Sequence, residues 1–111
     1  MLPFGAIILA RFPFTDLTGD KRRPALVVSA GMRGSDVVVC FITSRPQAGP
    51  HSATIVPAVS NGLKVVSLVM FDQITTLHES VVSGVLGEAS TDWLSVNAAA
   101  FQAVFGFSRS A

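Results

Sequence analysis

The chain has 111 residues, of which 50% are hydrophobic and 14% are charged, and its formal net charge at pH 7 is +1. This length indicates one domain, residues 1–111, and the composition excludes an intrinsically disordered chain. No apolar run reaches the roughly 18 residues that a membrane-spanning helix needs. The apolar run Ile7–Ala10 has no basic side chain before it, so a secretory signal is not indicated. We expect a cytoplasmic protein without a membrane partner.

The small net charge hides an uneven distribution along the chain. Residues 1–64 carry seven basic and three acidic side chains, whereas residues 65–111 carry one basic and four acidic side chains. A polarised domain of this kind can attract an anionic partner to one face. The high apolar content also leaves little polar material for the surface, so we expect a homodimer that hides part of it.

The chain has a single cysteine, Cys40, between Val39 and Phe41. It permits no internal disulfide, and its apolar neighbours predict a residue of the core. Together with His51 and His78 it offers no zinc-ligand spacing, so we expect no metal and no cofactor.

Most of the chain is predicted to form short strands, because its apolar, β-branched runs are bounded by turn formers. Asn61-Gly62 marks one turn, and Asp72-Gln73 interrupts another apolar run. In chain order the expected strands are Gly5–Arg11, Pro24–Ser29, Asp36–Ser44, His51–Val56, Lys64–Phe71, Ile74–Leu77 and Val81–Leu86.

After Gly87 the sequence pattern changes from that of strands to that of a helix. Ser90-Thr91-Asp92 supplies candidate N-caps and an acid that favours a helix start. The apolar residues Leu94, Ala98, Phe101, Val104 and Phe105 recur at helical spacing and predict a helix over residues 91–105, with Gly106 as its stop. The predicted fold is mainly β with a C-terminal helix: a small, strongly bent barrel over about 1–88 and a helix over about 90–106.

Three consecutive cations, Lys21, Arg22 and Arg23, lead into a strand through Pro24. Proline biases the residue before it toward an extended backbone, so Arg23 should be held by the sheet. A fixed guanidinium suits a phosphate because it stays charged and offers a planar fork of donors. The alternative is that both arginines are solvated charges at a strand edge.

The strand over Asp36–Ser44 ends in two hydroxyls, Thr43 and Ser44, and Arg45 follows. If this strand pairs with Pro24–Ser29 as a hairpin, the start of one lies beside the end of the other. Arg23 and Thr43 would then be neighbours at one end of the sheet.

Two further features bear on a site. Phe12 and Phe14 stand in a loop of turn formers, where they either stack on bases or fold back on the core. Asp72 stands at a break in an apolar run, where it is either a turn former or a catalytic carboxylate.

These segments together resemble the MazF/PemK family of toxin-antitoxin ribonucleases. The resemblance runs through nearly the whole chain in the same order, and the Arg-Pro strand with the following Thr-Ser strand is its most specific part. The segments that carry it are Gly5–Arg11, Phe12–Leu17, Lys21–Ser29, Ile42–Ser44, Asp72–Leu77 and Leu86-Gly87.

The resemblance implies an SH3-like barrel of the CcdB/PemK type, a homodimer, and metal-independent cleavage of single-stranded RNA. It also implies inhibition of translation and growth, and neutralisation by a cognate antitoxin. By the same resemblance, Arg23 is the catalytic cation, Thr43 contacts the scissile phosphate and Asp72 is a candidate general base. We assign RNA contacts to Phe12, Phe14, Thr15, Lys21, Arg22, Ser44, Arg45 and Gln73.

The chain departs from the family pattern at two positions. Met70 stands where some members carry an arginine, so a paired acid-base scheme with Asp72 does not follow. Ala6 replaces a usual acidic residue, which concerns structure or dimer contacts.

RNA cleavage through the 2′-hydroxyl needs a base, charge stabilisation at phosphorus and protonation of the leaving 5′-oxygen. It predicts products with a 2′,3′-cyclic phosphate and a 5′-hydroxyl. One alternative uses His51 and His78 as an acid-base pair. A second alternative is a non-catalytic homologue that binds RNA or antitoxin. A third is a gyrase poison of the same fold. Such toxins use a Trp-Gly-Ile type of C-terminus, whereas this chain ends in Phe107–Ala111.

Overall fold

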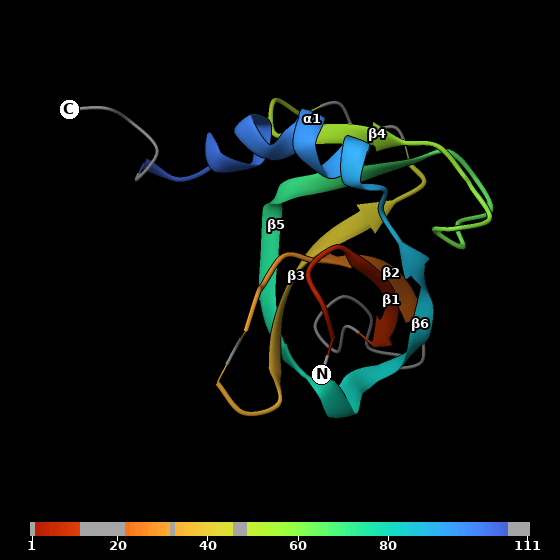
Figure 1. Cartoon of the computed structure of the whole chain (residues 1–111), viewed down its shortest axis with the longest axis vertical. Coiled ribbons are helices and arrows are strands. Elements are labelled where there is room, and N and C mark those ends of the chain that lie inside the picture. The colour runs from red at the N-terminus through yellow and green to blue at the C-terminus, as the bar shows by residue number, and fades with distance from the viewer. Residues whose placement is uncertain (1, 12–21, 32, 46–48, 107–111) are drawn as a thin grey trace.

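Six strands pair into one antiparallel sheet with the order β4-β5-β3-β2-β1-β6. The computed structural model describes residues 2–11, 22–31, 33–45 and 49–106. Figure 1 shows the sheet curling into an open barrel, with the helix lying across one end above β4. The elements are β1 Ala6–Arg11, β2 Arg22–Val27, β3 Asp36–Thr43, β4 Ser52–Ile55, β5 Ser67–His78, the 3₁₀ turn η1 Glu79–Val81, β6 Val82–Glu88 and α1 Thr91–Gln102.

The strand β3 packs into the core on both of its faces, as its apolar run predicts. Alternate residues of β3 enter two separate clusters: Val37 and Val39 join one, and Cys40 and Ile42 join the other. The first cluster also takes Ile8, Ala10, Ala25 and Val27 from β1 and β2. The second lies on the side of α1, where Phe71 packs against the rings of Trp93 and Phe101. The predicted mainly β fold, an SH3-like barrel with a C-terminal helix, is confirmed.

The strand β2 begins two residues earlier than expected, at Arg22 instead of Pro24. Arg22 pairs with Arg11 and Arg23 with Ala10, so β1 holds both arginines in the sheet. Pairing with β3 begins only at Ala25, just after the proline, because Pro24 has no amide proton to donate. Arg22 and Arg23 therefore belong to a strand that is paired along one edge and open along the other.

The expected break at Asp72-Gln73 is not a break in the strand. One strand of twelve residues, β5, runs from Ser67 to His78, and its register with β3 shifts between the pairs Cys40–Ile74 and Ile42–Val69. Such a bulge bends a strand while pairing continues on both sides. The prediction of two strands, and of a strand beginning at Lys64, was wrong, because residues 64–66 lie before β5.

The helix α1 has the predicted start, since Ser90 caps it by accepting a hydrogen bond from the amide of Trp93 at 3.1 Å. It ends at Gln102, three residues earlier than predicted. Val104 and Phe105 donate to Phe101 and Gln102, the tighter i→i−3 pattern that often closes a helix. No helix in the described ranges is long and apolar enough to cross a membrane.

Two smaller predictions are confirmed. Asn61 is buried and braces its turn, because its side chain accepts from the amides of Ala58 and Leu63. Gly62 follows at φ +72°, a conformation that favours glycine. Cys40 is a free, buried thiol, and burial first and the charge of Asp72 second raise its pKa to about 12.

Candidate active site

The β2–β3 hairpin has a turn at one end, and we call the opposite end, where β2 begins and β3 ends, its open end. Several residues near this end pair across neighbouring strands. Ala10 pairs with Arg23, Thr43 pairs with Leu68, and Leu68 pairs with Thr54. The β2–β3 ladder has Ala25 opposite Phe41, and the same register continued by two residues sets Arg23 opposite Thr43. Directly opposed residues point to the same face, with neighbouring strands about 4.8 Å apart. The ladder itself stops at Ala25, so the meeting of Arg23 and Thr43 stays a prediction that this register favours.

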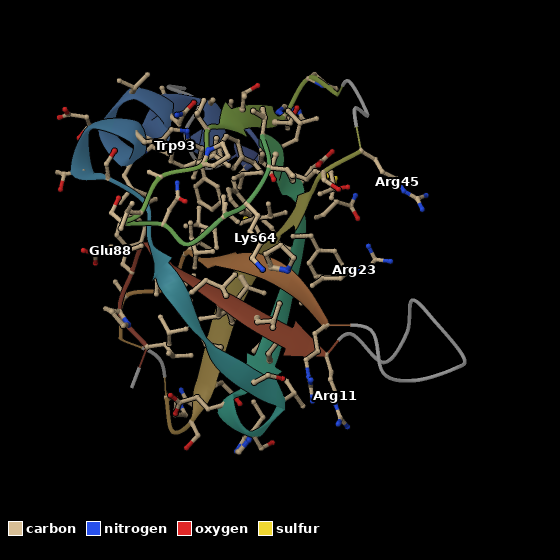
Figure 2. All side chains as sticks on the ribbon, turned by 90° about the vertical axis from the view of Figure 1, so that its right-hand side faces the viewer. Arg11, Arg23, Arg45, Lys64, Glu88 and Trp93 are labelled. Atoms are coloured by element: carbon tan, nitrogen blue, oxygen red, sulfur yellow. The ribbon has the colours of Figure 1, made fainter. Side chains whose placement is uncertain are left out.

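Arg23 is half-buried, and its Nε is a buried donor with no hydrogen-bond partner in the described part of the chain. An unmade hydrogen bond of this kind costs about 1–3 kcal/mol. Figure 2 shows Arg11, Arg23 and Arg45 projecting from the same side of the molecule. The arrangement leaves a guanidinium with free donors among other cations, which suits an anion.

Thr43 is half-buried, and its Oγ1 accepts a hydrogen bond from the Arg45 amide at 3.1 Å. A threonine hydroxyl has one proton to donate and two lone pairs to accept. Because the amide uses a lone pair, the hydroxyl proton stays available for a ligand oxygen. Thr43 can thus donate to the same anion that Arg23 attracts.

A hollow of about 200 Å³ opens beside Thr43. No local sequence pattern predicts it, because its walls come from segments that are distant in the chain. It is lined by Thr43, Ser44, Arg45, Thr54, Val66, Ser67 and Leu68.

Asp72 and Gln73 are exposed and lie in the register shift of β5. The recorded neighbour of the Asp72 carboxylate is Cys40, whose pKa it helps to raise. No recorded contact joins Asp72 to Arg23 or Thr43. Its assignment as a base therefore stays a prediction.

Met70 pairs with Ser52, two positions along β5 from the pair of Leu68 with Thr54. Because side chains alternate along a strand, Met70 shares a face with Leu68 and hence with Thr43. The departure from the family pattern thus lies on the face of the candidate site.

The two histidines do not form a pair within the fold. The backbone carbonyl of His51 accepts from Phe71, beside β4, while His78 ends β5 and caps η1 by accepting from the Ser80 amide at 3.1 Å. Figure 1 shows β4 and the turn after β5 at opposite ends of the molecule.

The remaining predicted contacts divide into two groups. Arg22, Ser44 and Arg45 are exposed and lie at the open end of the hairpin or just beyond it. Phe12, Phe14, Thr15 and Lys21 lie outside the described residues. Within the described ranges, no three His, Cys, Asp or Glu side chains gather into a group that could hold a metal ion.

The fold is that of a small barrel protein, with Arg11, Arg23 and Arg45 on one side of the molecule. The chain belongs to the PemK-like, MazF-like toxins of type II toxin-antitoxin systems, since the model of that family matches residues 4–105. A search of curated proteins found no match.

Several solved structures have a similar fold. An endoribonuclease in complex with its cognate antitoxin, from Mycobacterial species, has a TM-score of 0.78 at 21% identity, covering 99% of this chain and 100% of that one. The Mycobacterium tuberculosis toxin MazF-mt6 has a TM-score of 0.73 at 21% identity, covering 90% and 95%. MazF in a MazE-MazF structure from Deinococcus radiodurans has a TM-score of 0.71 at 27% identity, covering 95% of each chain.

Proposed function

We propose that this chain is an endoribonuclease toxin that cleaves single-stranded RNA at short sequences without a metal ion. The products would carry a 2′,3′-cyclic phosphate and a 5′-hydroxyl. The observation that carries the proposal is the buried Nε of Arg23, which has no hydrogen-bond partner in the described residues. Family membership supports it, as do similar structures that are described as endoribonucleases.

Attack of the 2′-oxygen on phosphorus concentrates negative charge on the two non-bridging phosphate oxygens. The Arg23 guanidinium and the Thr43 hydroxyl proton would both donate to these oxygens. A preorganised donor of this kind contributes roughly 10²–10³ in rate. The Arg45 amide fixes Thr43 Oγ1 before the substrate arrives, so little reorganisation is needed.

Two proton transfers complete the reaction. The 2′-hydroxyl loses a proton as its oxygen bonds to phosphorus, and the 5′-oxygen gains one as its bond to phosphorus breaks. Arginine cannot act as the base because it stays protonated in proteins. We assign the base to Asp72, which is exposed and able to approach a bound strand; a water molecule or a phosphate oxygen is the alternative.

We also propose that the chain works as a homodimer that a small cognate antitoxin neutralises, blocking growth and translation when free. Support comes from the similar structures described as antitoxin complexes. The structure adds exposed apolar side chains that a partner could cover, such as Phe4 at 52% exposure and Val96 at 80%.

The test is incubation of the purified chain with a long single-stranded RNA in EDTA, with cut sites and end groups mapped. Discrete cuts with cyclic-phosphate ends are expected, and Arg23→Ala should lower the rate by roughly 10²–10³. Arg33→Ala is the matched control, because Arg33 is an exposed arginine in the turn at the other end of the same hairpin. Ends with a 5′-phosphate, or equal losses in both variants, would refute the mechanism.

A non-catalytic RNA-binding or antitoxin-binding homologue is the second candidate, because Met70 lies on the face of the site. It predicts binding of RNA or antitoxin without cutting by the wild type. If the Met70→Arg variant then cleaved RNA, the methionine at this position would be the cause of the missing activity.

A further inference from the structure

Strand pairing alone does not fix two parts of the candidate site. The strand β4, which supplies Thr54 to the hollow beside Thr43, has four residues and stands at one edge of the described sheet, with β5 as its neighbour. In β5, the recorded ladders with β3 and β4 pair neither Asp72 nor Gln73 with another described residue. Both parts therefore depend on a contact from outside the sheet to keep a fixed position.

The side chain of Trp93 makes such a contact with β4. Figure 1 shows α1 lying across this strand. The N–H and C=O groups of one residue in an antiparallel strand face the same edge, and the Thr54 carbonyl accepts a hydrogen bond from Trp93 Nε1 at 2.9 Å. The edge of β4 that β5 leaves open is thus fastened to α1 at the residue that lines the hollow.

The same indole packs against β5 directly before Asp72. The ring of Phe71, which is 2% exposed, has its centroid 6.2 Å from that of Trp93 and 5.7 Å from that of Phe101. The Phe71 amide also donates to the His51 carbonyl, next to β4, at 2.7 Å. Phe71 is therefore a buried anchor at the start of the stretch that the ladders leave unpaired.

Trp93 is itself held at both of its backbone polar groups. Its amide donates to the Ser90 hydroxyl at 3.1 Å, and its carbonyl accepts from the Asn97 side-chain amide at 2.9 Å. Just before the helix, the Ala89 amide donates to the Gly5 carbonyl at 2.9 Å, which ties the start of α1 to the start of β1. The indole is thus a fixed support, and a support fixed before binding keeps the cost of ordering small.

We propose that Trp93 is a positioning residue of the candidate site. Its indole N–H fixes β4 through the Thr54 carbonyl, and its ring fixes the start of the bulge in β5 through Phe71. It acts through these two residues and does not touch the substrate. That the site cleaves RNA, with Asp72 as the base, rests on the proposed function. The helix α1 is then part of the construction of the site, although none of its residues lines the hollow.

The two contacts of Trp93 can be removed one at a time. Trp93→Phe removes the N–H and keeps a ring against Phe71, whereas Trp93→Leu removes both. Phe105→Leu is the matched control, because it removes a ring that packs on Phe101, with centroids 5.4 Å apart, after the end of α1. A single-stranded RNA of mixed sequence with 2′-fluoro sugars, which lacks the attacking hydroxyl, measures binding apart from cleavage.

Trp93→Phe should raise the KM for cleavage, and the Kd for the 2′-fluoro RNA, roughly 2- to 10-fold, as expected for one hydrogen bond. Its kcat should stay at the wild-type value, the pattern of lost uniform binding. Trp93→Leu should also lower kcat roughly 10- to 100-fold, because a small displacement of a reacting group is costly. Phe105→Leu should leave both constants unchanged.

This split between KM and kcat separates positioning from stability. Partial unfolding lowers the active fraction, which reduces the apparent kcat and leaves KM unchanged. Circular dichroism and urea unfolding check that each variant is folded under the assay conditions. A Trp93→Phe variant that loses kcat at an unchanged KM would therefore overturn the proposal, as would equal effects in Phe105→Leu.

A double variant tests the path through Phe71. Phe71→Leu removes the other ring of the same contact, so combining it with Trp93→Leu should lower kcat by clearly less than the product of the two single losses. Losses that multiply would mean that the two rings act separately, and would overturn the positioning of Asp72 by Trp93.

The outcomes distinguish this proposal from the proposed function. Cutting by the wild type, with normal KM and kcat in both Trp93 variants, would overturn the positioning role and leave the ribonuclease standing. Binding of the 2′-fluoro RNA that Trp93→Phe weakens, without any cutting of RNA by the wild type, would support the tie to β4 and refute the ribonuclease. A wild type that neither binds nor cuts RNA would refute both.

Discussion

The two ends of the β2–β3 hairpin differ in how far their polar groups are hydrogen-bonded within the fold. At the turn end, the Ser29 hydroxyl accepts from the Val38 amide at 3.1 Å, and the Ser35 carbonyl accepts from the Glu79 amide at 2.8 Å. At the open end, the ladder stops at Ala25 and Arg23 Nε is left without a partner in the described residues. The polar groups at the turn end are hydrogen-bonded within the fold, whereas the open end leaves the buried Arg23 Nε without a partner in the described residues.

The origin of the difference lies in the strand ends. The turn end joins consecutive residues through Gly31 and Gly34, both at positive φ, so its backbone closes on itself. Near the open end, the β2–β3 ladder stops just after Pro24, and the register of β5 with β3 shifts between Cys40 and Ile42. Interrupted pairing is what gives side chains room to meet a substrate.

The largest expected effect at the open end is at Thr43. Thr43→Val removes the hydroxyl with little change of shape and should lower RNA cleavage by about 10²-fold, since one transition-state donor is lost. Thr43→Ser should restore most of the rate. Single-turnover kinetics on a short RNA measure this, with Thr76→Val, on the far part of β5, as the control that should cut normally. A fully active Thr43→Val would remove this hydroxyl from the mechanism.

Arg23 offers a test of stability against activity. Arg23→Met keeps an unbranched apolar stem and removes the buried, unpartnered Nε, so the free energy of unfolding should rise by about 1 kcal/mol while cleavage is lost. Urea unfolding measures the change. A loss of stability of that size would instead mean that Nε is satisfied in the native protein, and the contrast between the ends would fail.

At Ser29 we expect the reverse of the effects at Arg23: lower stability and unchanged cleavage. Ser29→Ala removes the acceptor of the Val38 amide and should lower the free energy of unfolding by about 1 kcal/mol, while cleavage stays at the wild-type rate. Urea unfolding and the RNA assay on the same preparation check both halves. A slower enzyme with normal stability would show that the turn end contributes to function.

The sequence predicted the part of the site that depends on a single hairpin. The antiparallel pairing of the two adjacent strands β2 and β3 was predicted, and the alternation of β3 is enough to bury Cys40. Both inferences need only neighbours in the chain.

What the sequence missed depends on pairing over longer distances. The polar pair Asp72-Gln73 suggested a break between two strands, but pairing with β3 on both sides carries β5 through it. The hollow needs the shifted register of β5 and the position of β4, which no local pattern encodes. No local pattern therefore pointed to Thr54 or Leu68, although they pair in one row with Thr43.

The hydrogen bond from Trp93 to Thr54 gives the chain an optical probe of its own site. Trp93 is the only tryptophan in the sequence, so indole fluorescence comes from one place. The indole is hydrogen-bonded to the carbonyl of Thr54, which lines the hollow, so we expect its emission to respond to a change at that wall. Filling of the hollow can thus be followed in the unlabelled protein, in real time and without a change to the chain.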